Sequence, residues 1–162
     1  DLVAKRKVDL GPFTHTKDDA IPLRLTALSI FAASLEKLPG SVDVVAFMPV
    51  LAKALADAED IQLHAHQIVL SMCARYPILL VNAVDIFVEP LEKTTNKKSG
   101  QKMGTELERF NDWIKSALRA TLAISQLDGA MNSRKFADFV ERIKRNPKHE
   151  STLQALEVEN KS

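Results

Sequence analysis

Apolar residues recur three and four positions apart along most of the chain, which is the spacing of one face of an α-helix. Residues 20–38 form the first such stretch, with Asp19 placed to cap its start and Pro22 tolerated in its first turn. A second stretch, with Ser41 as its candidate cap, contains Pro49, where we expect the helix to bend or to begin. The positions on the expected face of the first helix are Leu23, Ala27, Ile30, Phe31, Ser34, Leu35 and Leu38.

The next stretch repeats the first at a distance of 38 positions. Ala65 then corresponds to Ala27, and Pro77 to Pro39. The helix expected after it, residues 78–94, contains a proline in FVEPL, as the earlier partner does in FMPVL. The sequence therefore predicts two helices in each repeat.

Helical pairs that recur about every 40 residues are typical of HEAT and armadillo solenoids, where each pair buries its apolar faces by stacking on its neighbours. We predict an all-α fold, a HEAT-repeat α-α solenoid of about three helix pairs with an N-terminal β-hairpin. An ordinary helical bundle is the alternative, because two and a half copies define a period weakly. The expected division is a hairpin extension at 1–19, HEAT-like repeats within 20–148 (about 20–57, 58–94 and 105–148) and a C-terminal tail at 149–162.

The last repeat is expected to follow a polar loop, residues 93–104. We interpret the lysines of this loop as part of a solvated linker, with contact to an acidic partner as the alternative. Thr105 and Glu108 have the spacing of a capping box, and Ser133 is a candidate cap for the last clear helix. Beyond Asn146-Pro147 we expect one weak helical turn and a polar tail that frays.

The stretch KVDLGPFTHTKDD, residues 7–19, departs from the helical spacing. Its residue types fit pleated strands, and Gly11-Pro12 between the two halves suits a turn, so the sequence predicts a short β-hairpin with its tip at these residues. A two-stranded hairpin is marginally stable alone, so this one must lean on helices or be completed by a partner. The alternative is an irregular lead-in to the first helix, with Phe13 in the core.

Composition and charge restrict the classes of partner. With 162 residues, 46% apolar and 27% charged, the chain has the composition of a folded protein. A net charge of +1 creates no global field, and the longest apolar run, residues 68–88, is interrupted by polar residues, so we expect neither nucleic acid nor a membrane as partner. The single Cys73, expected to be a small buried residue, excludes an internal disulfide. We expect a reducing intracellular location, in the cytoplasm and nucleus, and a chain that starts at Asp1 as part of a longer protein.

No catalytic or metal site can be assembled from the sequence. His64 and His66 lie two positions apart and so point to different faces of a helix. The carboxylates within residues 57–60 are explained as favourable charge at a helix N-terminus, and the five glycines form no phosphate-binding loop. We interpret these two histidines and His149 as surface residues, and we expect no enzymatic activity, no cofactor and no metal.

Four stretches together resemble the C-terminal end of the cullin-associated, neddylation-dissociated (CAND) family, a region also called the TATA-binding-protein-interacting domain. The hairpin stretch is the most specific, because helix packing does not explain GPF followed by HT and DD. The resemblance covers nearly the whole chain and implies the last repeats of a long HEAT solenoid. The four stretches are GPFTHTKDD at 11–19, VEPL at 88–91, KSALRA at 115–120, and the spaced Phe139, Ile143 and Asn146-Pro147.

The resemblance implies a regulatory binding module for cullin–RING ubiquitin ligases. Such proteins hold the N-terminal, adaptor-binding domain of an unmodified cullin, in competition with the substrate-receptor adaptor, and thereby promote receptor exchange. The hairpin is implied to project into the surface that the adaptor would occupy. The residues that the resemblance assigns to this contact are Val8, Leu10, Gly11, Pro12, Phe13, His15 and Thr16.

A generic HEAT-repeat interaction scaffold is the alternative function, with the hairpin only covering the first helix pair. The expected first helix also departs from the family pattern, because Leu25 follows Arg24 where a second basic residue is expected. Because repeats inside a solenoid are apolar on both sides, a piece of one should expose an apolar face where the preceding repeats would pack.

Overall fold

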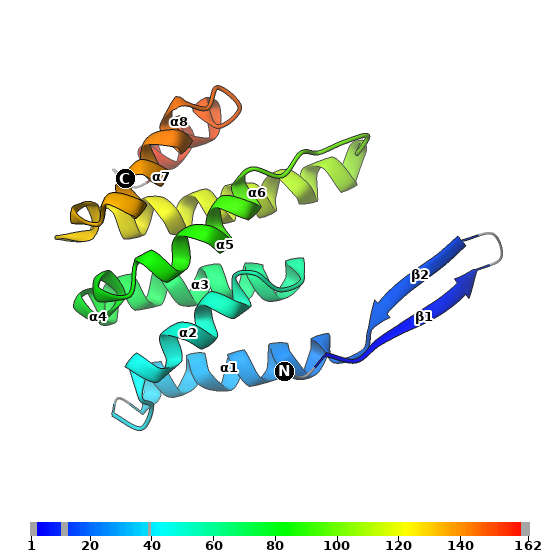
Figure 1. Ribbon diagram of the computed structural model, residues 1–162, viewed down its shortest axis with the longest axis horizontal. Coiled ribbons are helices and arrows are strands. Elements are labelled where there is room, and N and C mark those ends of the chain that lie inside the picture. Colours follow the sequence, from blue (N-terminus) through cyan, green and yellow to red (C-terminus); the bar gives the residue numbers. More distant parts are fainter. Residues whose placement is uncertain (1–2, 11–12, 39, 160–162) are drawn as a thin grey trace. The chain divides into compact units, whose positions relative to one another are not determined.

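The computed structural model describes residues 3–10, 13–38 and 40–159. These residues form an all-α fold with one two-stranded antiparallel sheet, as predicted (Figure 1). The chain divides into two compact units, Asp1–Asp43 and Val44–Ser162. Within the described ranges, no helix has both the length and the apolar character needed to cross a membrane.

The first unit consists of the hairpin and one helix. Strands β1 (Lys5–Leu10) and β2 (Phe13–Asp18) precede helix α1 (Ile21–Lys37), which has a proline in its first turn as predicted. The prediction that Asp19 caps α1 is wrong, because Ala20 occupies the cap position and provides no side-chain hydrogen bond. Ser41 does not cap the next helix either, since that helix begins only at Val44 and the Ser41 hydroxyl donates to the Leu38 carbonyl.

The second unit is built from two layers of helices. Helix α3 packs beside α6 in one layer, and α5 contacts both α2 and α7 in the other. Figure 1 shows α2 and α5 slanting across the direction of α3 and α6. The short helix α8 packs on α6 and α7. The elements are α2 (Val44–Ala54), α3 (Glu59–Arg75), α4 (Pro77–Asn82), α5 (Asp85–Thr95), α6 (Gly104–Ser125), the 3₁₀-helix η1 (Ala130–Asn132), α7 (Arg134–Arg145) and α8 (Glu150–Glu159).

The sequence period is reproduced in the backbone. Helices α1 and α3 each contain 17 residues, and both ends of α3 lie 38 positions after the corresponding ends of α1. The residues that end them share one conformation, with φ −130° and ψ 62° at Leu38 and φ −134° and ψ 48° at Tyr76. Helices α2 and α5 each contain 11 residues and have a proline in sixth place, Pro49 and Pro90. In both of these repeats a helix of 17 residues precedes one of 11 residues that contains a proline, and in the second repeat the short α4 lies between them.

Equivalent positions of the repeat differ in burial. Leu23 and Ile30 of α1 are 60% and 62% exposed, whereas Ile61 and Ile68, 38 positions later in α3, are 1% and 3% exposed. Leu38 at the end of α1 is also 60% exposed. Leu23, Ile30 and Leu38 therefore leave apolar surface uncovered along α1 and at its C-terminal end.

Two helix boundaries differ from the predictions. The helix expected over residues 78–94 is two helices, α4 and α5, because the N–H groups of Ala83 and Val84 bond three residues back and tighten the chain between them. The capping box at Thr105 is absent, because α6 already begins at Gly104, whose positive φ of 56° suits glycine. Ser133 does cap α7, and its hydroxyl accepts the Phe136 N–H at 3.1 Å.

The C-terminal segment is more ordered than the sequence predicted. Residues Glu150–Glu159 form α8, where one weak turn and a fraying tail were expected. Leu153 and Leu156 are buried, and Glu159 forms ion pairs with Lys115 and Arg119 of α6. Burial of these leucines supplies the stabilisation that helical propensity alone does not give so short a segment.

Two histidines predicted to lie on the surface are buried. His66 is fully buried, with its Nδ1 atom 3.1 Å from the Ser116 hydroxyl, and burial lowers its pKa from 6.5 to about 4. His149 is 6% exposed, and burial also lowers its pKa. Both rings are therefore neutral near pH 7 and belong to the packed interior.

Gln62 on α3 joins three segments of the second unit through buried hydrogen bonds. Its Oε1 atom accepts from the Thr94 hydroxyl at 2.8 Å and from the Trp113 indole N–H at 3.1 Å. Its Nε2 atom donates to the Asp57 carbonyl at 2.7 Å. Because buried donors without acceptors are costly, this side chain fixes α5 and α6 against α3.

We expect Gln62→Ala to lower the free energy of unfolding by about 2–4 kcal/mol, because it leaves two buried donors without an acceptor. The measurement is urea unfolding followed by circular dichroism. Gln67→Ala is the matched control, since Gln67 is exposed on the same helix and its loss should cost no more than about 0.5 kcal/mol. Equal losses in the two variants would contradict the role of Gln62.

The lowered pKa of His66 makes stability depend on pH. Between pH 6.5 and pH 4 the unfolded chain binds a proton that the folded chain does not, so stability falls as the pH falls. We expect His66 to account for a loss of about 2 kcal/mol between pH 7.5 and pH 5, measured by urea unfolding at both values. In His66→Leu the loss should shrink to the part that His149 contributes in the same direction, and an unchanged loss would refute the assignment.

Candidate functional site

The hairpin is the candidate site, and its backbone has a regular antiparallel register. Val8 pairs with His15, and Leu10 pairs with Phe13 at the distal end. These four residues and Thr16 lie in the two strands, and Val8 is half-buried. The predicted tip, Gly11-Pro12, lies outside the described residues, as do the side chains of Leu10, Phe13, His15 and Thr16. Burial of Phe13 in the core therefore stays an untested alternative.

Cationic side chains surround the proximal half of the hairpin. Lys5, Arg6, Lys7 and Lys17 are all exposed. Arg6 and Lys17 are directly opposed in the register, an arrangement that is unfavourable for like charges. Asp19 compensates, because its carboxylate forms an ion pair with Arg6 and lies 3.7 Å from the Lys17 ammonium.

Asp18 joins the hairpin to the start of α1. Its Oδ1 atom accepts the N–H groups of Ala4, at 3.1 Å, and of Ala20, at 3.0 Å, while its Oδ2 atom lies 2.8 Å from a guanidinium nitrogen of Arg24. The hydrogen bond to Arg24 is the main cause that lowers the pKa of Asp18 to about 2. One carboxylate thus ties β1, β2 and α1 together. Sequence reasoning missed this role because it assigned the cap to the neighbouring aspartate.

The described residues provide neither a metal site nor an activated cysteine nucleophile. No group of three or more histidine, cysteine or carboxylate side chains within them could hold a metal ion. Cys73 is half-buried, and burial raises the pKa of its thiol to about 11, so it is protonated near neutral pH and a poor nucleophile.

Comparison with known proteins gives consistent matches. Residues 2–144 match the family described as TATA-binding protein interacting (TIP20). Cullin-associated NEDD8-dissociated protein 2 of Rattus norvegicus is 29% identical over 163 aligned residues, which include the whole chain. Cullin-associated NEDD8-dissociated protein 1 is 31% identical in Drosophila melanogaster and 33% in Arabidopsis thaliana, over 88% and 87% of the chain. The chain spans 13%, 12% and 12% of the lengths of these three relatives.

We expect Asp18→Ala to loosen the hairpin from α1, because it removes acceptors for two backbone N–H groups and the partner of Arg24. The measurement is amide hydrogen exchange at β1 and β2, which should become faster while exchange in α3 and α6 stays unchanged. Asp19→Ala is the matched control and should have a smaller effect, since Asp19 makes only exposed ion pairs. Because the pKa of Asp18 is about 2, the contact should hold at neutral pH and be lost as the pH falls from 3.8 towards 2.

Proposed function

The chain belongs to the TATA-binding protein interacting (TIP20) family, and on that basis we propose that it is a binding module of a cullin–RING ubiquitin ligase regulator. The relatives are cullin-associated proteins by name, which supports a cullin as the partner. The module docks on the N-terminal domain of an unmodified cullin. There it competes with the substrate-receptor adaptor and so promotes receptor exchange. It acts by binding and not by catalysis.

The hairpin is the observation that carries this proposal. Both of its strands have an outer edge, and within the described residues no third strand pairs with either. A two-stranded hairpin needs support to be stable, and here the Asp18 carboxylate supplies it through its contacts with Ala20 and with Arg24 of α1. Leu10 and Phe13 pair at the end of the ladder farthest from this anchor, and we infer that this end of the hairpin reaches the other molecule.

Competition of this kind is a thermodynamic linkage. If the hairpin and the adaptor overlap on the cullin, each lowers the affinity of the other by the same coupling free energy. Couplings of about 1–3 kcal/mol are common and change an affinity by roughly 5- to 150-fold. A partial overlap is therefore sufficient for exchange, because neither partner has to exclude the other completely.

We expect the chain to weaken the binding of a labelled adaptor to a cullin N-terminal domain by roughly 5- to 150-fold at saturation. Replacement of residues 11–15 by a short polar turn should remove most of this effect while the chain still binds the cullin through its helices. The measurements are fluorescence anisotropy of the adaptor and direct binding of the chain to the cullin. Lys135→Ala/Lys144→Ala on α7 is the control variant, because both lysines are exposed on a helix remote in sequence from the hairpin.

Two outcomes would overturn parts of the proposal. Unchanged competition after the replacement would remove the hairpin from the mechanism and favour a generic HEAT scaffold. Failure of the intact chain to bind any unmodified cullin N-terminal domain would remove the cullin as its partner.

A further inference from the structure

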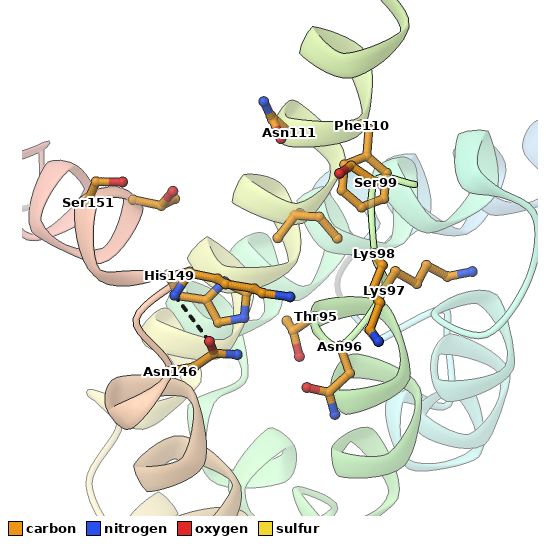
Figure 2. A pocket seen from close by; sticks show the side chains of 13 residues that line it. Thr95, Asn96, Lys97, Lys98, Ser99, Phe110, Asn111, Asn146, His149 and Ser151 are labelled. Carbon is orange, nitrogen blue, oxygen red and sulfur yellow. Dashed lines mark hydrogen bonds between the residues drawn. The ribbon is translucent and has the colours of Figure 1, made fainter. Parts of the chain in front are cut away.

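A cavity of about 760 Å³ lies in the second unit, where the chain after α5, the first half of α6 and the start of α8 meet. Figure 2 shows Asn96, Lys97 and Lys98 on one side of it and Asn146, His149 and Ser151 on the other. Its volume is within the range of sites that bind organic ligands or peptide side chains.

The charged side chains that line this cavity are all lysines. Lys97 and Lys98 contribute from the chain after α5, and Lys148 contributes from the turn before α8. No carboxylate lines the cavity, and across the described part of the chain none of these three lysines forms an ion pair with one. The cavity is therefore a locally basic surface on a chain whose net charge is only +1.

Neutral hydrogen-bonding groups lie between these charges. The side chains of Asn96, Asn111 and Asn146 carry amides that can both donate and accept. Ser151 and Thr152 lie in the first turn of α8, where backbone N–H groups lack helical acceptors and the helix dipole is positive, although Glu150 of the same turn, outside the lining, partly offsets it. This set of groups favours an anionic ligand that also offers polar atoms along its length.

One buried polar atom beside the cavity is unsatisfied. His149 is 6% exposed, and its Nε2 atom has no hydrogen-bond partner within the described residues. Buried polar atoms without partners are rare in folded proteins and call for an explanation. A ligand that enters the cavity and shifts this ring slightly would give Nε2 a partner.

An apolar contact connects the cavity to the only tryptophan of the chain. Phe110 and Ile114 of α6 line the cavity, and Phe110 meets the Trp113 ring edge to face with 6.1 Å between centroids. The Lys97 ammonium lies 4.9 Å from the centroid of the Trp113 ring. A ligand that pairs with Lys97 would weaken this cation–π contact and change the fluorescence of Trp113.

We propose that this cavity binds an acidic peptide segment of a partner protein, with an apolar residue on Phe110 and Ile114 and flanking carboxylates at Lys97, Lys98 and Lys148. The apolar wall and the amide groups are what an extended peptide uses and a small anion does not. None of the described lining residues is an arginine, whose planar guanidinium binds phosphate in a bidentate manner, and this argues against a phosphate ligand. The polar residues 93–104, interpreted from sequence as a solvated linker, thus gain the alternative role of contacting an acidic partner.

The test uses the full chain and a short capped peptide of aspartate and glutamate around one central leucine. We expect a saturable change in Trp113 fluorescence that weakens as salt is added, because the contacts are largely between exposed charges. In Lys98→Ala/Lys148→Ala the dissociation constant should rise roughly five- to tenfold. Lys135→Ala/Lys144→Ala is the matched control, since it removes the same charge from α7 outside the cavity and should leave the affinity unchanged.

Three results would overturn the proposal. Absence of binding would refute it directly, and equal weakening in both double variants would show attraction to net charge without a site. Inorganic phosphate alone, if it produced the same fluorescence change and displaced the peptide at similar concentration, would make the cavity a small-anion site. None of these results bears on the hairpin, which belongs to the other unit.

Discussion

A buried amide must have its hydrogen bonds satisfied, and the second unit is arranged around Gln62, which meets this requirement on three segments. Apolar burial holds the helices together, but it is not directional and permits one helix to slide along another. Hydrogen bonds are directional, so the contacts of Gln62 to Thr94 and Trp113 fix the positions of α5 and α6 along the axis of α3. Trp113 in turn places Phe110 and Lys97, and with them the wall of the cavity.

The repeat was predictable from sequence because prolines and helix-ending residues, which control the backbone, recur in it together with the apolar residues. The same turn geometry recurs at Leu38 and Tyr76, each of which precedes a proline that disfavours a continued helix. Pro49 and Pro90 likewise mark corresponding places in two helices of equal length. Burial was less predictable, because Leu23 and Ile61 are equivalent in the pattern yet differ in what covers them. Periodicity identifies an apolar face but does not say what packs on it.

The sequence predicted where the hairpin lies but not which contacts connect it to α1. In the pair Asp18-Asp19 either carboxylate could have capped α1, and only the strand register decides that Asp18 faces the first helical turn while Asp19 neutralises the opposed Arg6 and Lys17. The burial of His66 and His149 was missed for a similar reason. A histidine gives no periodic signal of its own, and whether it is buried depends on partners such as Ser116 that lie far along the chain.

An exposed strand edge invites pairing with other chains, so a protein that presents one for recognition must also prevent aggregation through it. Here the proximal half of the hairpin carries Lys5, Arg6, Lys7 and Lys17, and such charges, lysine above all, oppose edge-to-edge association of identical chains. The same cations leave a partner with acidic groups free to approach. The anchor at Asp18 fixes the base, and the charges limit what can pair along the sides. Under the proposed function, the distal residues of the hairpin would therefore set its selectivity, because the proximal ones act mainly through charge.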